Sequence, residues 1–212
     1  MPNHVAVTLQ IIGTITQVAE VRSAIAGPDK LIDFHKLIPR PPSLEISSGP
    51  EAEIAKWDHR ESLSRDHARW VGEPREVDRQ VAKPDILAAC VANIHTHGCP
   101  TWYEWNLDNW GTKWGAYEQH EISRDKIGFQ TANSVPGPIL ATIAARFPEV
   151  KFVVMYADED HGSNQGTLTY SGGHLESRDE LPGDHRSKAR RMLSYRMHGY
   201  DAATIAEAES DE

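Results

Sequence analysis

Two histidines and a cysteine alternate near the middle of the chain, with a second cysteine shortly before them. His95, His97 and Cys99 follow Cys90, and imidazole nitrogen and thiolate sulfur are the ligands that zinc prefers. The spacing differs from that of known zinc knuckles, and alternate residues point the same way only on a strand. We predict a loop here, before a helix. Uncoordinated histidines are therefore the favoured interpretation, and a metal site is the alternative.

Two pairs of carboxylates could supply a site for a hard divalent cation such as Mg²⁺ or Mn²⁺. Glu104 and Asp108 lie four residues apart on a predicted helix, and Asp158 and Glu159 follow a predicted buried strand. Grouped around a metal, these acids would predict a hydrolase or nuclease. The favoured interpretation is structural: Asp158 or Glu159 pairs with Lys113 or accepts an indole N–H, because buried tryptophans need such partners.

Other signatures of catalysis are missing from the sequence. No Ser/His/Asp arrangement stands out, and the chain has neither a Gly-x-x-x-x-Gly-Lys loop nor a strand–Gly-x-Gly–helix fingerprint. We therefore expect no cofactor and favour a protein without enzymatic activity.

Four of the six tryptophans fall within residues 102–114, which is a far higher density than the rest of the chain has. Each indole can bury about 150–250 Å², so this segment either builds a core or furnishes a contact surface. Trp102, Trp105 and Asn109 share one face of a predicted helix that Gly111 ends. We expect Trp105 and Trp110 to be mainly buried and to tie the segment onto a sheet.

This segment resembles the signature of the YubB-like family of ferredoxin-like domain proteins, which plasmids and phages carry. Residues 1–4, 34–41, 129–136 and 156–159 match the same family in order, so that the resemblance covers about residues 1–173. It implies a ferredoxin-like fold and an origin in a mobile element, but little chemistry. The run from His95 to Cys99 and the tail beyond His174 depart from the family pattern. The residues of the implied binding or structural signature are Trp102, Tyr103, Trp105, Asn109, Trp110, Lys113, Trp114, Asp158 and Glu159.

Hydropathy patterning predicts two β-α-β halves, typical of an α+β ferredoxin-like fold with an antiparallel sheet and helices on one face. In the first half we predict a strand over 4–12, a helix capped by Thr14 and Gln17, and a second strand over 31–38. In the second half, strands around Ile127 and over 151–157 flank a helix, and residues 167–170 form a hairpin partner. The predicted strands lack the basic and aromatic pattern of RNA-binding sheets.

A charged insertion at about 50–119 separates the halves, and a polar extension follows them. Between residues 51 and 85, 16 of 35 residues are charged, which favours exposed helices with one buried stripe. That stripe comprises Leu63, His67, Trp70 and Val71. Residues 174–212 predict a basic amphipathic helix with an acidic end, packed on a domain that spans 1–173.

Composition narrows the function further. With 22 Lys+Arg against 31 Asp+Glu the net charge is −9, which argues against general affinity for nucleic acid or anionic membranes. No spanning segment or secretory signal is evident, and two cysteines make no disulfide framework, so we expect a cytoplasmic protein. We expect it to bind a host protein or protein complex, in the form of an inhibitor of a host defence system. An assembly protein is a further alternative, and the sequence leaves the oligomeric state open.

Overall fold

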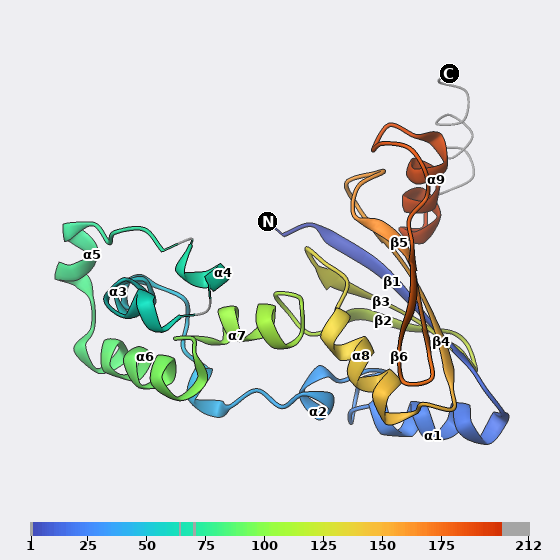
Figure 1. Ribbon diagram of the computed structural model, residues 1–212, viewed down its shortest axis with the longest axis horizontal. Coiled ribbons are helices and arrows are strands. Elements are labelled where there is room, and N and C mark those ends of the chain that lie inside the picture. Colours follow the sequence, from blue (N-terminus) through green and yellow to red (C-terminus); the bar gives the residue numbers. More distant parts are fainter. Residues whose placement is uncertain (1, 64, 70, 201–212) are drawn as a thin grey trace. The chain divides into compact units, whose positions relative to one another are not determined.

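A six-stranded antiparallel sheet organises one part of the chain (Figure 1). The computed structural model describes residues 2–63, 65–69 and 71–200. The chain divides into two compact units, Met1–Ile38 with Trp110–Glu212, and Pro39–Asn109. We call the first the sheet unit and the second the helical unit.

The sheet has the strand order β2-β3-β1-β4-β5-β6, and every neighbouring pair is antiparallel. Its strands are β1 (His4–Ile12), β2 (Tyr117–Ser123), β3 (Lys126–Ala132), β4 (Lys151–Asp158), β5 (Gln165–Ser171) and β6 (His174–Asp179). With the helices α1 (Ile15–Ile25) and α8 (Gly137–Arg146), the chain runs β1-α1-β2-β3-α8-β4. This connectivity confirms the predicted ferredoxin-like fold.

Strand β1 lies inside the sheet, between β3 and β4, and every second residue along it is apolar and buried. Val5, Val7, Leu9 and Ile11 are at most 2% exposed and form one face of the core. Helix α1 begins with the predicted capping box, in which the Thr14 side chain accepts from Gln17 N and the Gln17 side chain accepts from Thr14 N. The buried stripes of α1 and α8 close the core on this side: Val18, Val21, Ile25, Ile139, Leu140, Ile143 and Ala144.

The predicted strand over 31–38 is wrong, because Phe34–Leu37 forms the short helix α2. The Asp33 carboxylate accepts a hydrogen bond from His35 N and caps this turn. Ile32 and Phe34 are both about 1% exposed. Two buried apolar residues two positions apart give the same alternating pattern as a strand. The strand that completes the first half is β2, which follows the whole helical unit in sequence.

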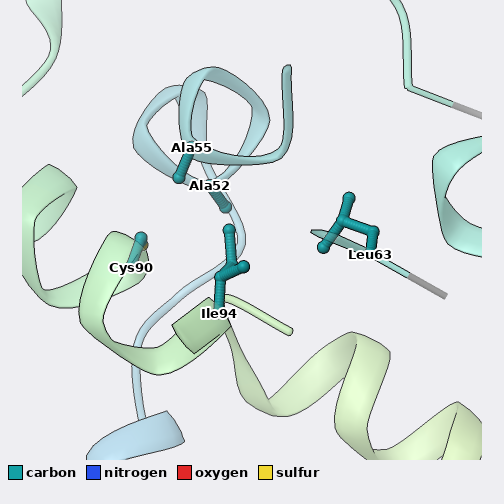
Figure 2. Close-up of a cluster of buried hydrophobic side chains, with 5 residues drawn as sticks. All are labelled: Ala52, Ala55, Leu63, Cys90 and Ile94. Carbon is teal, nitrogen blue, oxygen red and sulfur yellow. The ribbon is translucent and has the colours of Figure 1, made fainter. Parts of the chain in front are cut away.

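The described part of the helical unit contains five α-helices and two short 3₁₀ turns, Pro42–Leu44 and Arg60–Ser62. The α-helices are α3 (Pro50–His59), α4 (Arg65–Ala68), α5 (Glu76–Val81), α6 (Pro84–His97) and α7 (Trp102–Asn109). A small apolar core joins α3 and α6, to which Ala52, Ala55, Cys90 and Ile94 contribute, together with Leu63 (Figure 2). We predicted a charged insertion at about residues 50–119. The helical unit in the structure spans Pro39–Asn109.

The predicted helical stripe between residues 63 and 71 is interrupted. Leu63 ends a 3₁₀ turn, Arg60–Ser62, and Val71 follows α4 in an irregular segment. Leu63 belongs to the core of the helical unit, and Val71 packs against that core. Trp70 and the side chain of His67 lie outside the described part of the structure.

The segment after His174 begins with a strand that the sequence did not predict. Residues His174–Asp179 form β6 on the edge of the sheet, antiparallel to β5 with a shift of register after Thr169. The predicted basic helix is present as α9 (Lys188–Met197), which buries Met192 and Ser194. The predicted acidic end, with Asp201, Glu207, Glu209, Asp211 and Glu212, lies outside the described residues.

Candidate functional site

One end of the sheet gathers polar side chains from segments that are far apart in sequence. The start of β1 lies between the ends of β3 and β4, since His4 pairs with Ala132 and Val5 pairs with Asp158. We call the polar residues at this edge the strand-end network: Asn3, His4, Tyr117, Asn133, Asp158, Glu159 and Asn164.

Asp158 is the buried acid of the strand-end network, with 4% of its surface exposed. Its Oδ1 accepts from Asn3 Nδ2 at 3.1 Å and from Asp160 N at 2.9 Å. Its Oδ2 accepts from Asn164 Nδ2 at 3.1 Å. Three N–H donors therefore compensate the cost of burying this carboxylate.

Two asparagines hold the backbone of the neighbouring turns in left-handed conformations. Asn133 has a φ of +70° and Asn164 a φ of +35°, a region that asparagine tolerates better than most residues. Asn133 Oδ1 accepts from Asn3 N at 3.0 Å, and Asn164 Nδ2 donates to Asn133 O at 3.0 Å. Asparagine at positions 133 and 164 therefore favours the backbone conformation of the two turns from which the network is built.

A histidine and a tyrosine form the other half of the network. Tyr117 OH donates to Thr131 O at 3.1 Å, and its oxygen lies 2.7 Å from His4 Nδ1. Because the phenol has one proton, His4 Nδ1–H is the donor in the second contact. Burial, with the charges of Glu159 and Glu118, raises the pKa of Tyr117 to about 12. The phenol is therefore protonated at neutral pH and cannot act as a base.

Glu159 completes the network through the backbone. Its Oε1 accepts from His4 N at 3.0 Å, and its own N–H donates to His4 O at 2.9 Å. This pair of bonds fastens the start of β1 to the end of β4. The Glu159 carboxylate, a cation ligand in the alternative interpretation, accepts a hydrogen bond from the backbone here.

Lys113 lies against an aromatic ring beside the strand-end network. Lys113 Nζ lies 4.9 Å from the centroid of the Trp114 ring, within the range of a cation–π contact. The Trp114 ring meets Tyr117 edge to face at 6.2 Å between centroids. Trp114 is 38% exposed, so an aromatic surface borders the strand-end network.

Trp110 confirms the expectation of a buried indole. It is 1% exposed, its Nε1 donates to Ile38 O at 2.9 Å, and its ring lies 5.8 Å from that of Phe34. Phe34 in turn meets Phe129 of β3 at 6.4 Å, which ties this part of the segment to the sheet. Gly111 follows with a φ of +76°, and a Cβ there would lie 2.7 Å from Pro138 Cδ.

The other tryptophan-segment residues lie on α7 in the helical unit. Trp105 is 8% exposed, as expected, and its carbonyl accepts from Asn109 Nδ2 at 2.9 Å. Trp102 and Tyr103 contact each other edge to face at 5.8 Å between centroids. These residues therefore belong to a different unit from Trp110, Lys113 and Trp114.

Glu104 and Asp108, the other pair of acids that the metal-site alternative would use, are also on α7. Glu104 is 3% exposed and accepts from Thr101 Oγ1 at 2.6 Å and from Lys56 Nζ at 3.1 Å. Burial lowers the pKa of Lys56, but its bond to Glu53 and the charges of Glu104 and Glu53 outweigh this and raise it overall. Asp108 is exposed near the end of the helix. Glu104 is thus an acceptor in a buried ion pair.

The predicted loop at His95 and His97 is wrong, because both residues belong to the last turn of α6. Two positions apart on a helix, they project about 200° apart around its axis and cannot share one ligand sphere. The His97 ring lies 3.2 Å from Ser43 Oγ, while His95 contacts His59 at 5.0 Å between centroids. Cys99 follows the helix cap Gly98.

Both cysteines are buried, and the pKa of each thiol is raised. Burial, then the charge of Glu104, raises the pKa of Cys99 to about 12, and burial raises that of Cys90 to about 11. Thiolate is the form that binds metal or attacks an electrophile. Among the side chains that the structure describes, no group of three or more His, Cys, Asp or Glu residues could hold a metal ion.

Comparison with known proteins agrees with this architecture. Residues 109–197 match a family model described as the ferredoxin-like domain in Api92-like protein. The match extends from the end of α7 to the end of α9. This match does not confirm the YubB-like plasmid or phage family, and no curated protein matches the chain.

A solved structure is also similar, namely the crystal structure of a protein Api92 from Yersinia pseudotuberculosis. It is 13% identical with a TM-score of 0.46, over 86% of this chain and 99% of that one. No helix in the described part of the chain has the length and apolar character needed to cross a membrane.

Sequence reasoning missed five members of the strand-end network: Asn3, His4, Tyr117, Asn133 and Asn164. Asn3, His4 and Asn133 lie in segments that carried the family resemblance, but nothing in their local pattern pointed to a shared location. The available signal was the repeated occurrence of Asn, His and Asp at predicted strand ends. Antiparallel topology brings the start of one strand beside the ends of its neighbours.

Proposed function

We propose that this is a non-enzymatic binding protein and that Trp114 anchors its contact surface. The supporting observation is the exposed indole beside a set of hydrogen bonds that hold its surroundings in place. Tryptophan dominates binding energy at many interfaces because it combines a large apolar area with few rotatable bonds. A rigid support reduces the entropy that binding must overcome.

The chemistry of the strand-end network favours binding over catalysis. Asp158 and Glu159 accept hydrogen bonds from the protein itself, and Tyr117 holds its proton with a pKa of about 12. A general base needs a pKa near the working pH and access to a substrate proton. These groups are better suited to maintaining the shape of the edge that presents Trp114.

The partner that we propose is a protein of the host of a mobile element. The resemblance in sequence suggests plasmid or phage carriage, and the net charge of −9 favours a protein over nucleic acid. In its most specific form, the proposal is an inhibitor that occupies the surface of a host defence protein in the cytoplasm. The indole of Trp114 with the neighbouring ammonium of Lys113 is suited to bind the surface of a partner protein.

Affinity capture from a bacterial lysate, with mass spectrometry, would identify the partner. Calorimetry with that purified partner would then compare wild type, Trp114→Ala and Leu175→Ala, an exposed apolar residue on β6. We expect Trp114→Ala to weaken binding by about 30-fold or more, which corresponds to about 2 kcal/mol. Unchanged affinity in Trp114→Ala, or equal losses in both variants, would contradict the proposal.

A further inference from the structure

A cavity of about 630 Å³ lies on the face of the sheet opposite the α1 and α8 core. Strands β2, β3, β1 and β4 form its floor, with Thr8 and Met155 among the floor residues, and the end of α9 forms its wall. The volume lies within the range of about 300–1,000 Å³ that small-molecule sites occupy. It belongs entirely to the sheet unit and does not include the strand-end network.

Specific hydrogen bonds hold α9 over this face. Arg190 Nε donates to Gly162 O and Arg190 Nη1 donates to Leu181 O, both at 2.8 Å. At the other end, the His198 ring donates from Nε2 to Ala157 O of β4 at 3.0 Å. The wall of the cavity is thus fastened to the sheet unit at both ends of the helix, and the cavity is a preformed feature.

The floor is shaped by an irregularity in β2. The register with β3 shifts between Tyr117 and His120, and Glu118 adopts a φ of +47°. His120 lies opposite Gly128, where a Cβ would overlap the imidazole ring. A bulge of this kind re-aims side chains, and such bulges are common beside binding sites. Here it lays an imidazole across the floor.

The lining combines cationic groups with an apolar wall. Lys126 of β3, on the floor, and Arg196 of α9, on the wall, supply two positive charges, against one carboxylate, that of Glu118. Thr8 and Gln130 add hydrogen-bonding groups to the floor. Met155, Leu193 and Met197 provide apolar and adaptable contacts. A net positive lining is notable in a chain whose net charge is −9.

We propose that this cavity binds a small organic anion, with a carboxylate or phosphate head and a flat apolar body. The head would lie between Lys126 and Arg196, where charge-assisted hydrogen bonds are stronger than neutral ones. The body would lie against the methionines and Leu193. Small-molecule sites generally have this composition, a few convergent polar groups in a mostly apolar enclosure.

Three probes of one shape test the proposal with the full chain. Calorimetry and thermal unfolding would compare 2-naphthoate, 2-naphthyl phosphate and the neutral 2-naphthalenemethanol. We expect at least one anion to bind about tenfold or more tightly than the alcohol, in line with a charged hydrogen bond. The stronger of the two anions identifies the head group. Equal affinity for all three, or binding of none at millimolar concentration, would overturn the proposal.

Matched variants locate the site. Lys126→Met and Arg196→Met should each weaken the bound anion about tenfold. The controls are Lys151→Met, at the far end of β4, and Arg191→Met, on α9 but outside the lining. Neither control should change affinity. Met155→Trp, which fills the cavity, should abolish binding of every probe while thermal unfolding remains cooperative. Undiminished binding in Met155→Trp, or losses in the controls equal to those in Lys126→Met and Arg196→Met, would place the anion elsewhere.

Discussion

The phenol oxygen of Tyr117 lies 2.7 Å from Nδ1 of His4, although more than a hundred residues separate the two in sequence. Since Tyr117 donates its proton to Thr131 O, this contact assigns the Nδ1–H tautomer to His4. The bond links β2 to the start of β1 across the end of β3. The bond therefore connects residues far apart in sequence at the end of the sheet where the strand-end network lies. Trp114 contacts Tyr117 at the same end.

Removing the hydroxyl group of Tyr117 should lower the free energy of unfolding by an amount that depends on pH. We expect Tyr117→Phe to cost about 1–2 kcal/mol at neutral pH through its two lost hydrogen bonds. The pKa of Tyr117 is raised from 10 to about 12, so the folded state holds this proton more tightly than the unfolded chain. The contribution is present below pH 10 and is lost as the pH rises towards 12.

Urea denaturation of wild type and Tyr117→Phe between pH 7 and pH 12 measures this effect. The stability difference between the two proteins should be constant up to about pH 10 and then decrease. Tyr156 and Tyr170, whose pKa values burial also raises, are common to both proteins and cancel. A difference that stays constant to pH 12 would show that Tyr117 ionises normally.

Truncation to alanine should destabilise the protein much more at the two buried tryptophans than at the exposed Trp114. Trp110→Ala removes a ring that is 1% exposed and an indole donor to Ile38 O, and we expect a loss of about 3–5 kcal/mol. Trp105→Ala should destabilise to a similar extent, because Trp105 is 8% exposed. Trp114→Ala should cost under ~1 kcal/mol. Thermal unfolding measures all three, and a Trp110→Ala protein that melts within a few degrees of wild type would contradict the assigned burial.

Asp158 should be required for its geometry and not as a metal ligand. In Asp158→Asn one oxygen becomes an NH₂ group that faces a donor, so we expect a loss of about 1–3 kcal/mol. Lys113→Met should cost about 1 kcal/mol or less, since a cation–π contact at an exposed ring is weak. Adding Mg²⁺ or Mn²⁺ should leave the wild-type melting temperature unchanged. A metal-dependent rise that Asp158→Asn abolishes would instead favour the hydrolase alternative.

In the helical unit, the buried pair of Lys56 and Glu104 should show coupling. We expect Lys56→Met to cost about 2–4 kcal/mol, because it removes the ammonium from the buried Glu104 carboxylate and leaves the Thr101 hydroxyl to donate to it. Adding Glu104→Gln to Lys56→Met should restore part of that loss. A double-mutant cycle in urea measures the coupling. Additive losses would show that the two groups do not interact.

The histidine and cysteine run should be inert towards metal and thiol reagents. Purified protein should contain less than stoichiometric zinc, and His95→Ala with His97→Ala should barely change stability. At pH 8 the thiols of Cys90 and Cys99 should react slowly with a disulfide reagent, because their pKa values are raised to about 11 and about 12. One tightly held zinc per chain, lost in the double variant, would reverse this conclusion.

The sequence by itself determined the elements whose pattern is local. Alternation marked β1, the capping box of Thr14 and Gln17 marked the start of α1, and apolar periodicity marked α8. Burial of Trp105 and Trp110 also followed from residue type, since large rings rarely remain in water without a function. These features depend on side chains close in sequence, so their physical causes are visible in the order of residues.

Only the tertiary structure decided which strands pair and which side chains meet. Residues 31–38 have the alternation of a strand, but the Asp33 cap and the burial of Ile32 and Phe34 favour α2, and β2 takes the expected place in the sheet. The strand-end network and the cavity beneath α9 depend on that pairing. Antiparallel neighbours bring Asn3, Asn133 and Asp158 together across long sequence separations, and no local preference of the chain encodes such a meeting.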